Sequence, residues 1–480
     1  MSRIGTPRAA DLARPVTRAT RPRRALRAVG SPFASIVTRS SRPPTRPPPD
    51  IFGKTWHHRP VAPPERLALN EALRGTLALV LAGGRGSRLH ALTDEIAKPA
   101  VPFAGKFRIV DFPLSNALNS GIRRIGVLTQ YRAHDLIRHI QRGWSFLRAE
   151  LGEFVELWPA QQNTDDRWYS GTADAVYQNL DVIEAHAPRH VLILAGDHVY
   201  RQDYSKLVRW HQKRGADVTV SCVEVPRAGA SDFGIVDADD EGRIRGFLEK
   251  PADPPPIPGR PDRAYASMGI YLFDADVLVD RLRRDANAES TQHDFGHDII
   301  PGLIGDAKIF AHPFSESCVH SAGATEPYWR DVGTLDAFWE ANLDFTHVTP
   351  QLDLYDESWR IWTYHEQRPA AKFVFDDSER RGMAVDSLVS AGCIVSGGTV
   401  RRSLLFTNVR VNSYSTVEDS VLLPGVDVGR HARLRKVVVA SGTNIPEGLV
   451  VGEDPAADAT RFHRTDGGVT LVTASMIDAL

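Results

Sequence analysis

The feature that most constrains the fold of this chain is a run of apolar residues at every sixth position near its C-terminus. Small and polar residues, mainly Gly, Ser, Thr and Asn, fill the gaps. The apolar positions fall into groups separated by breaks in phase: Leu388, Ile394 and Val400; Leu405, Val411 and Val417; Val428 and Leu434; Val439, Ile445 and Val451. Six residues per flat side and three sides per coil are typical of a parallel β-helix, whose coils bury one apolar stripe by stacking. We therefore predict a β-helix over residues 376–480, with loops at the breaks in phase.

An antiparallel β-sandwich is the alternative fold for this C-terminal segment. A sandwich strand alternates apolar and polar residues with a period of two and does not require a period of six. The repeated groups of β-branched residues therefore favour the β-helix. Such a domain usually stabilises and assembles a protein rather than catalysing a reaction.

Upstream of the repeat, the chain alternates short apolar strands with segments of helix length. The first apolar run, Leu77–Ala82, ends in two glycines. Further strands are expected at 124–129, 191–195, 218–225 and 269–273, and helices at 133–142, 172–186 and 334–345. This alternation predicts an α/β domain over residues 73–345, with a Rossmann-like, mostly parallel sheet wrapped by helices. A linker is expected at residues 346–375.

The N-terminal segment differs from the rest of the chain in its charge. Residues 1–66 hold thirteen arginines and one lysine against three acidic residues, and they are rich in Pro, Ser and Thr. Such a segment cannot bury much apolar surface, so we expect residues 1–72 to be a disordered extension. It is compatible with a transit peptide, a nucleic-acid-binding tail, or a non-functional extension from a misplaced start codon. We favour the last of these, and expect no nucleic-acid partner.

Composition places the protein in the soluble class. No run approaches the roughly 18 apolar residues of a membrane span, so no membrane partner is expected. The three cysteines, Cys222, Cys318 and Cys393, are too few and too far apart for a disulfide framework or a zinc cluster. These features favour a reducing, cytoplasmic location.

The segment with the clearest chemical signal is LAGGRGSRLHALTDEIAKPAVP, residues 81–102. Glycines after a strand let backbone amides approach phosphate oxygens closely, because no Cβ intervenes. Arg85, Arg88 and Lys98 add three cations, which suit a leaving pyrophosphate better than a singly charged ligand. A dinucleotide site would instead need GxGxxG with an acidic residue about twenty positions on, and that spacing is absent. We predict a nucleotidyltransferase loop.

Two aspartates are candidates for binding a metal on the phosphates. Asp197 follows the apolar run 192–195, and ligands of parallel sheets bind beyond the carboxyl ends of strands. Asp331, in WRDVGT, supplies a second carboxylate before a helix. Two such carboxylates can chelate one Mg²⁺, which then bridges phosphate groups. An aspartate that only caps the next helix is the structural alternative for Asp197.

The segment FLEKP, residues 247–251, is a candidate sugar-phosphate site. Lys250 offers a point charge for a phosphate and Glu249 an acceptor for sugar hydroxyls. A Glu-Lys pair alone is commonly a solvated charge pair. The neighbouring motifs favour the binding role.

Six further segments resemble bacterial glucose-1-phosphate adenylyltransferases, which are sugar-nucleotide pyrophosphorylases. They are GKFRIVDFPLSNALNSGI (105–122), IQRGWSF (140–146), WYSGTADAVYQN (168–179), SDFGIV (231–236), SMGIYLF (267–273) and HDFGHDIIP (293–301). The resemblance runs from Leu77 to the C-terminus. It implies synthesis of ADP-glucose from ATP and glucose 1-phosphate for glycogen or starch synthesis, with Mg²⁺, a left-handed β-helix, phosphorylated metabolite effectors and a homotetramer.

The resemblance also implies roles for residues at matching positions. Asp197, Arg88 and Lys98 would be catalytic, with Asp197 and Asp331 holding the metal. The sugar phosphate would be bound by Tyr169, Gly234, Glu249, Lys250 and Ser267. The nucleotide would be bound by Gly83, Gly84, Arg85, Gln130 and Trp168.

One position departs from the resembling enzymes. Members activated by fructose 1,6-bisphosphate have a lysine where this chain has Glu95, whereas the basic Arg108 is retained. A carboxylate repels a bisphosphate, so activation by this compound is expected to be weak. Another phosphorylated metabolite could instead reach Arg108 together with arginines of the β-helix.

Three other functions compete with this interpretation. A relative that uses another nucleoside triphosphate would share the glycine loop, which reads phosphates and not the base. A non-catalytic regulatory subunit would be expected to lack Asp197, Arg88 or Lys98, and all three are present. An acyltransferase of the β-helix class would need a histidine in the coils, where His431 is the only candidate.

Overall fold

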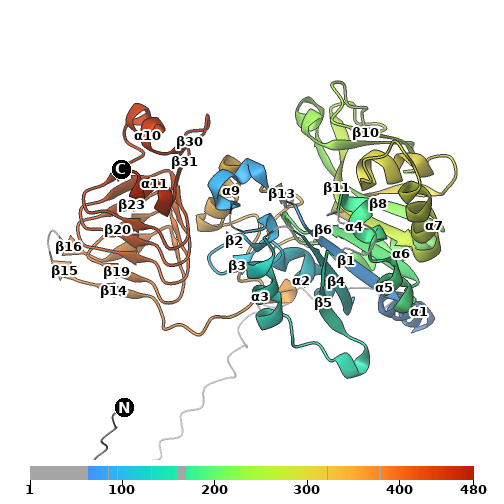
Figure 1. Cartoon of the computed structure of the whole chain (residues 1–480), viewed down its shortest axis with the longest axis horizontal. Coiled ribbons are helices and arrows are strands. Elements are labelled where there is room, and N and C mark those ends of the chain that lie inside the picture. Colours follow the sequence, from blue (N-terminus) through green and yellow to red (C-terminus); the bar gives the residue numbers. More distant parts are fainter. Residues whose placement is uncertain are drawn as a thin grey trace, which may run out of the picture. The chain divides into compact units, whose positions relative to one another are not determined.

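A computed structural model shows that the chain folds into a domain built around one large β-sheet, followed by a domain of stacked coils whose strands form three further sheets (Figure 1). The structure describes residues 63–84, 86–94, 96–130, 132–160, 169–321, 323–377 and 380–480. Residues 61–480 form one unit by their contacts. Within the described ranges, no helix is both long enough and apolar enough to cross a bilayer.

The first domain is built on a nine-stranded mixed sheet. Its path is β10 (Ile244–Glu249), β9 (Gly234–Ala238), β11 (Arg263–Asp274), β6 (His190–Ala195), β1 (Thr76–Ala82), β4 (Arg124–Thr129) and β5 (Phe154–Pro159), while β8 (Val218–Pro226) pairs with β11 and with β12 (Ile309–Pro313). Strands β6, β1, β4 and β5 are mutually parallel, as the sequence predicts. Strand β11 runs antiparallel to β6 and β8.

The apolar run of β1 is explained by the helices that cover both faces of the sheet. Ala78, Val80 and Ala82 join one core cluster, whereas Leu77 and Leu79 join another. Both faces of the strand are therefore dry, and every position from Leu77 to Ala82 is apolar. The helices of the domain are α1 (Pro63–Arg74), α2 (Asp111–Asn119), α3 (His134–Gly143), α4 (Thr172–Tyr177), α5 (Leu180–Ala185), α6 (Tyr204–Arg214), α7 (Ala275–Ala286), α8 (Phe314–Ser317) and α9 (Leu335–Leu343).

Helix α1 corrects the predicted N-terminal boundary. Residues 63–72 were expected in the disordered extension, but they form most of this helix, and Leu69, Ala72 and Leu73 are buried against the sheet domain. These ten residues therefore belong to the folded domain. The remainder of the predicted extension, residues 1–62, lies outside the described residues.

The segment predicted as one helix over residues 172–186 is two short helices, α4 and α5. Asn179 lies at the break, and its side-chain nitrogen Nδ2 donates to Ala175 O at 2.8 Å and to the Tyr169 hydroxyl at 3.1 Å. A side chain that bonds to nearby backbone competes with helix continuation. The break also gives Tyr169 a fixed partner.

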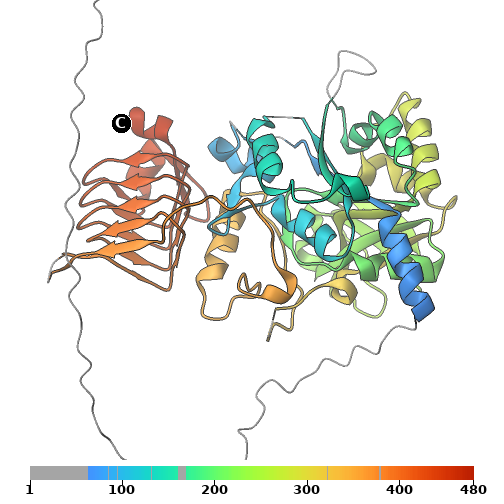
Figure 2. The ribbon, with the colours of Figure 1, turned by 90° about the horizontal axis from the view of Figure 1, so that it is seen from below.

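The C-terminal strands form three sides of a parallel β-helix (Figure 2). One side contains β14 (Lys372–Val374), β19 (Ile394–Ser396), β22 (Arg410–Val411), β25 (Asp427–Val428) and β28 (Asn444–Ile445). The second contains β17 (Met383–Val385), β20 (Thr399–Arg401), β23 (Thr416–Glu418), β26 (Arg433–Arg435) and β29 (Val450–Val451). The third contains β18 (Leu388–Val389), β21 (Leu404–Leu405), β24 (Val421–Leu422), β27 (Val437–Val439), β31 (Thr470–Val472) and β30 (His463–Arg464).

The breaks in phase are not loops, because one side of each later coil is one residue shorter than the other two; the first coil, from Leu388 to Leu404, has 16 residues. Leu405 pairs with Leu422, and Leu422 with Val439, so successive coils are 17 residues apart in sequence. The tight corner before this side uses residues with positive φ: Arg402 (42°) and Asp419 (48°). Their side chains form an ion pair at 2.7 Å across adjacent coils.

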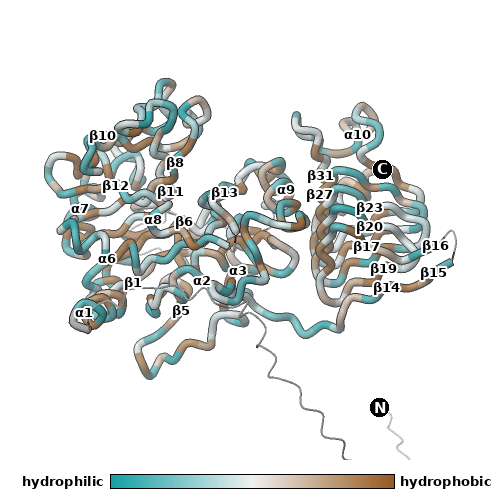
Figure 3. The backbone as a smooth tube through the Cα atoms, turned by 180° about the vertical axis from the view of Figure 1, so that it is seen from behind, coloured by the Kyte–Doolittle hydropathy of each residue, from teal (hydrophilic) through white to brown (hydrophobic). Residues whose placement is uncertain are grey.

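The first coil also differs from the predicted stripe. Val389 and Val395 face the β-helix core, where Leu388 and Ile394 were predicted, because the pairing places Val389 beside Leu405 and Val395 beside Val411. The later coils keep the predicted residues and add Leu422. Figure 3 colours β27 brown because its three residues are all valine.

The segment predicted as a linker packs along the first domain before the β-helix begins. Trp362 N donates to Ser115 Oγ at 2.8 Å, and Thr363 Oγ1 donates to Asp111 Oδ2 at 2.7 Å. Its last part, Lys372–Val374, is already strand β14 of the first coil. The β-helix then contacts the first domain through Trp339 Nε1, which donates to Asp419 O at 2.7 Å.

The packing of the 17-residue coil yields a stability prediction. Leu422 is fully buried, so Leu422→Ala should cost about 2–5 kcal/mol and lower the midpoint of thermal unfolding by roughly 4 °C or more. Arg401→Ala, at an exposed position of the same domain, should change the free energy of unfolding by about 0.5 kcal/mol or less. Circular dichroism melts of both variants check this. Equal midpoints would contradict the assignment of Leu422 to the core.

Candidate active site

The candidate site is a cavity of about 650 Å³ beyond the carboxyl ends of β1, β4 and β6. Ten predicted site residues line it: Gly83, Gly84, Arg88, Lys98, Gln130, Tyr169, Asp197, Gly234, Glu249 and Ser267. They come from segments up to 184 positions apart, Gly83 and Ser267 being the extremes. The fold therefore brings the predicted nucleotide and sugar-phosphate segments to one place.

The floor of the cavity holds an ammonium group between two carboxylates. Lys98 Nζ lies 2.9 Å from Asp197 Oδ2 and 3.1 Å from Asp331 Oδ1. Lys98 is 4% exposed, so a lone charge would be costly there. Burial opposes the charge, but Asp197 and Asp331 outweigh it and raise the pKa of Lys98.

The two carboxylates converge because of strand register. Asp197 follows the end of β6, and Asp331 is the last residue of β13 (Trp329–Asp331). Strand β13 pairs antiparallel with β7 (His198–Tyr200), with Asp331 opposite His198. Desolvation tends to raise the pKa of Asp197, but the attraction of His198 and Lys98 is larger and lowers that pKa to about 2. Asp197 is therefore ionised at neutral pH.

The glycine turn after β1 is shaped by close approaches to neighbouring side chains. An added Cβ at Gly86 would lie 2.8 Å from Lys98 Cβ, and Gly86 has a φ of 65°. At Gly83 an added Cβ would lie 3.3 Å from both Cβ and Oε1 of Gln130. These glycines let the loop fold back onto Lys98 and let Gln130 stand beside the turn.

Arg88 lies across the turn, near the carboxylate of Asp331. An added Cβ at Gly333 would be 3.2 Å from Arg88 Nη2 and 2.9 Å from Asp331 Oδ1. Arg88 is exposed to the cavity that it lines. Its guanidinium is thus placed to meet an anionic ligand. Arg85 and Trp168, also predicted for the nucleotide site, lie outside the described residues.

The opposite wall of the cavity carries the predicted sugar-phosphate residues. Tyr271, which also lines it, has its hydroxyl 3.3 Å from Ser267 Oγ. Glu249 pairs with Lys250 Nζ at 3.1 Å. Lys250 is not among the described residues that line the cavity. Its side chain is 62% exposed, and its backbone has a positive φ of 46°. The chain thus places Lys250 beside the cavity rather than in it.

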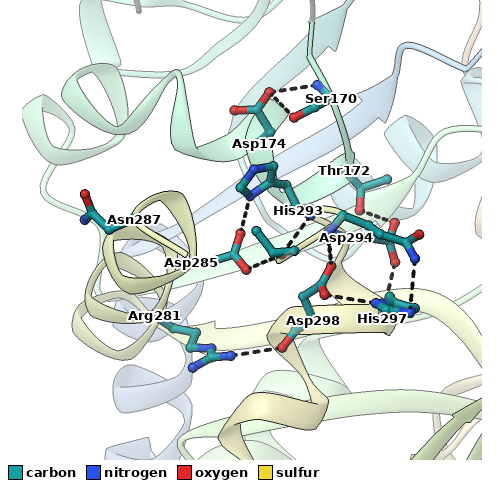
Figure 4. Close-up of polar contacts among 12 residues, drawn as sticks. Ser170, Thr172, Asp174, Arg281, Asp285, Asn287, His293, Asp294, His297 and Asp298 are labelled. Atoms are coloured by element: carbon teal, nitrogen blue, oxygen red, sulfur yellow. Dashed lines mark hydrogen bonds and ion pairs between the residues drawn. The ribbon is translucent and has the colours of Figure 1, made fainter. Parts of the chain in front are cut away.

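Hydrogen bonds between residues 172–173 and 293–294 join two segments of this wall, and we call this network the latch (Figure 4). The sequence analysis did not assign it to the site. Thr172 Oγ1 donates to Asp294 Oδ2 at 2.8 Å, and Ala173 N donates to His293 O at 2.7 Å. His293 Nδ1 lies 2.8 Å from Asp285 Oδ2, behind the wall. Asp294, Phe295 and Gly296 line the cavity.

The signal that could have identified this network is the segment HDFGHDIIP itself. It places two aspartates, two histidines and a glycine within six residues, and so many polar side chains around a glycine suggest a turn held by side-chain hydrogen bonds. Asp294 Oδ1 accepts hydrogen bonds from Gly296 N and His297 N, at 2.8 and 3.1 Å. The same aspartate thus caps the turn with one oxygen and holds Thr172 with the other.

Arg108, one of the two predicted allosteric positions, is not among the described residues that line this cavity. Arg108 lines a second cavity of about 470 Å³, between the first domain and the β-helix. The cations there are Lys106, Arg108, Arg138 and Arg142, all from the first domain. Arginines of the β-helix, which were expected there, are not among the described residues that line it. Glu95 lies outside the described residues.

Comparison with known proteins agrees with this arrangement. Residues 77–348 match the family described as nucleotidyl transferase, and residues 369–472 match the GlmU-like C-terminal hexapeptide family. The second match and the parallel coils are consistent with the predicted left-handed β-helix.

Full-length relatives carry one name. The chain is 67% identical over 416 residues to a glucose-1-phosphate adenylyltransferase from Rhodospirillum rubrum, covering 86% of this chain and 98% of the relative. It is 63% identical over 415 residues to one from Paramagnetospirillum magneticum, covering 86% and 97%. It is 59% identical over 413 residues to one from Bradyrhizobium diazoefficiens, covering 86% and 98%.

The latched wall yields a prediction about Gly171. A Cβ at this residue would lie 2.3 Å from His293 O and 2.4 Å from Gln292 O, so Gly171→Ala must displace one side of the latch. We expect a loss of about 1–3 kcal/mol and a thermal midpoint lower by roughly 3 °C or more. Gly229→Ala, which meets no atom within 4 Å, is the matched control. Differential scanning calorimetry checks both, and an unaltered midpoint in Gly171→Ala would contradict the latch.

Proposed function

The chain belongs to the glucose-1-phosphate adenylyltransferases of the nucleotidyl transferase family, and we propose that it joins ATP and glucose 1-phosphate into ADP-glucose and pyrophosphate. This reaction supplies the activated glucose for glycogen synthesis. The observation that carries the proposal is the Lys98–Asp197–Asp331 contact at the floor of a cavity with a glycine turn on one side and sugar-phosphate residues on the other.

The residues at the floor fit a divalent cation. Asp197 follows strand β6 and Asp331 ends strand β13, and both already contact one positive group, the Lys98 ammonium. Carboxylate oxygens are the ligands that Mg²⁺ prefers, so we propose that these aspartates hold Mg²⁺. When bound, the ion supplies charge neutralisation on the phosphates of ATP.

The reaction needs no nucleophile from the protein. A phosphate oxygen of glucose 1-phosphate forms a bond to the α-phosphorus of ATP, and the bond from that phosphorus to pyrophosphate breaks in line. We propose that Arg88 and Lys98 neutralise the negative charge that builds up on the departing pyrophosphate. Lys98 must then exchange part of its contact with the two aspartates for contact with phosphate.

The roles on the two walls follow from their chemistry. Backbone amides at Gly83 and Gly84 approach the triphosphate, and Gln130 stands beside them near the nucleotide. On the other wall, Glu249 accepts hydrogen bonds from sugar hydroxyls, with Tyr169, Gly234 and Ser267 around the ring. Lys250 turns from Glu249 to the phosphate of glucose 1-phosphate, which its exposed side chain permits.

The second cavity supports a proposal about regulation. Its four cations and the hydroxyls of Ser390 and Thr407 suit a phosphorylated metabolite. It joins the first domain to the β-helix, and Ser390 Oγ donates to Gly105 O at 3.0 Å beside it. A ligand bound there would therefore bias the arrangement of the two domains around it.

Exposed phenylalanines at one end of the β-helix and three free cysteines support proposals about assembly and location. Strand β14 is the outermost strand of its sheet, and Phe373 in it and Phe375 just after it are each 45% exposed, which suits burial against another copy in a homotetramer. Cys222, Cys318 and Cys393 are free thiols, and the substrates are metabolites of the cytoplasm. We therefore place the enzyme in the cytoplasm.

The first prediction from this function concerns the nucleotide. ATP should support pyrophosphate release with glucose 1-phosphate at a kcat/KM at least about tenfold above UTP, GTP or dTTP, which is roughly 1.4 kcal/mol of base discrimination. A coupled pyrophosphate assay with each nucleotide measures this. Equal rates with UTP would contradict adenylyl transfer, and no turnover with any nucleotide would favour the regulatory subunit.

A second prediction separates the floor from the sugar wall. Asp197→Asn should lower kcat by about a thousandfold or more, because the carboxylate charge acts on the phosphates in the transition state. Lys250→Ala should instead raise the KM for glucose 1-phosphate with a smaller change in kcat, the sign of lost ground-state binding. Asp240→Asn and Lys308→Ala, at exposed positions that are not among the described residues lining the cavity, are controls. Identical kinetic profiles for Asp197→Asn and Lys250→Ala would disprove this division of roles.

A third prediction concerns the second cavity. Arg142 is exposed and lines it, so Arg142→Gln should raise the half-activating concentration of the effective phosphorylated metabolite about fivefold or more. Activation curves for fructose 1,6-bisphosphate and a panel of other sugar phosphates measure this. Arg209→Gln, an exposed position on α6, is the control. An unchanged curve for every activator would place the effector site elsewhere.

A further inference from the structure

A second cluster of metal-ligating side chains lies at the end of the sheet opposite the active site. It consists of His190, the first residue of β6; His211, on α6; and Asp274, the last residue of β11. Strand β6 carries Asp197 beyond its other end. The reaction proposed above makes no use of this cluster.

The three side chains point their ligand atoms at one another. His211 Nε2 lies 3.3 Å from Asp274 Oδ1, and His190 Nε2 lies 3.5 Å from the same oxygen. All three ligand atoms lie within 4.8 Å of one another. The two rings are nearly perpendicular, with an interplanar angle of 89°, so neither blocks the approach of the other nitrogen.

These separations are compatible with a shared ion. His211 Nε2 is within hydrogen-bonding distance of Asp274 Oδ1, whereas His190 Nε2, 3.5 Å from the same oxygen, forms no hydrogen bond with it. Ligands bound tetrahedrally at about 2.0–2.1 Å from zinc lie roughly 3.3–3.4 Å apart. The observed distances are therefore close to the edges of such a coordination sphere.

The surroundings hold His211 in place and leave one direction open, whereas His190 Nδ1 is buried without a hydrogen-bond partner. His211 Nδ1 lies 2.8 Å from Thr219 Oγ1, the kind of outer contact that orients a metal-bound imidazole. His190 and His211 are 2% and 1% exposed, whereas the Asp274 side chain is 42% exposed. Solvent can therefore supply a fourth ligand and give an ion access.

We propose that His190, His211 and Asp274 bind one zinc ion, with water as the fourth ligand. Two imidazole nitrogens and one carboxylate favour zinc over Mg²⁺ and Ca²⁺, which select oxygen ligands. The ion links β6, α6 and β11 at the end of the sheet opposite the cavity. It therefore stabilises the first domain and takes no part in turnover.

Competing metal sites set the design of the test. His57 and His58 are adjacent in the sequence and can bind zinc without a folded site, so every protein is tag-free, full-length and carries His57→Gln and His58→Gln. Mg²⁺ is kept saturating so that the Asp197–Asp331 site does not take up zinc. An added Asp197→Asn substitution should leave zinc binding unchanged.

Zinc affinity is then measured by competition with a chromophoric chelator. We expect one zinc per chain, with affinity lowered at least about 100-fold by His190→Gln or Asp274→Asn. Zinc should raise the thermal midpoint of the background protein by about 2 °C or more and leave that of both variants unchanged. His312→Gln, which removes another histidine that is 1% exposed, is the matched control and should keep both effects.

Cobalt provides a readout that does not depend on the folding of a variant. Co²⁺ added to the unsubstituted site should give the intense visible absorption of a tetrahedral ion, and zinc should displace it. Zinc uptake of less than one ion per chain, an octahedral cobalt spectrum, or equal zinc affinity in the background protein and the folded variants would each overturn the proposal. The cluster would then be a hydrogen-bonded polar group.

Discussion

The placement of a buried ammonium group between two carboxylates is the interaction around which the rest of the active site is arranged. Lys98 is almost fully buried and needs Asp197 and Asp331 to remain charged there. Its position depends on the glycine turn, because any side chain at Gly86 would collide with it. The positions of the aspartates depend on the end of β6 and on the register of β13 with β7. Packing on both faces of the mixed sheet holds the end of β6, and pairing with β7 holds β13, so two residues 134 positions apart in sequence, Asp197 and Asp331, can share one cation.

The β-helix is built on an equally simple constraint, a coil that must close on itself with one short side. Each coil after the first has 17 residues, the tight corner contains a left-handed residue such as Arg402 or Asp419, and the next coil repeats it directly above. Stacked corners can then pair opposite charges, as these two residues do. The same side packs on the first domain through Leu404, Val421 and Val438, which join residues of α9 in one apolar cluster. The coils thereby support the wall of the second cavity.

Much of this architecture could be predicted from the sequence, where a physical rule links neighbouring residues. The run Leu77–Ala82 followed by glycines indicates a buried strand and phosphate loop, and the period of six indicates stacked coils. What could not be predicted depends on contacts between distant residues. The register that sets Asp331 beside Asp197 has no local signature, and although the segment HDFGHDIIP signals a turn, nothing in it identifies Thr172 as the partner of Asp294. The shift of the first coil by one residue arose because a period of six was applied to a side of five.

We propose that Lys98 occupies the place between two aspartates that a divalent cation shares when substrates bind. Crystals grown with Mn²⁺, a non-hydrolysable ATP analogue and glucose 1-phosphate would test it through the anomalous scattering of manganese. We expect one manganese peak at about 2.2 Å from carboxylate oxygens of both Asp197 and Asp331, with Lys98 Nζ turned toward a phosphate oxygen. A peak bound by neither aspartate, with the Lys98 contacts unchanged, would contradict it.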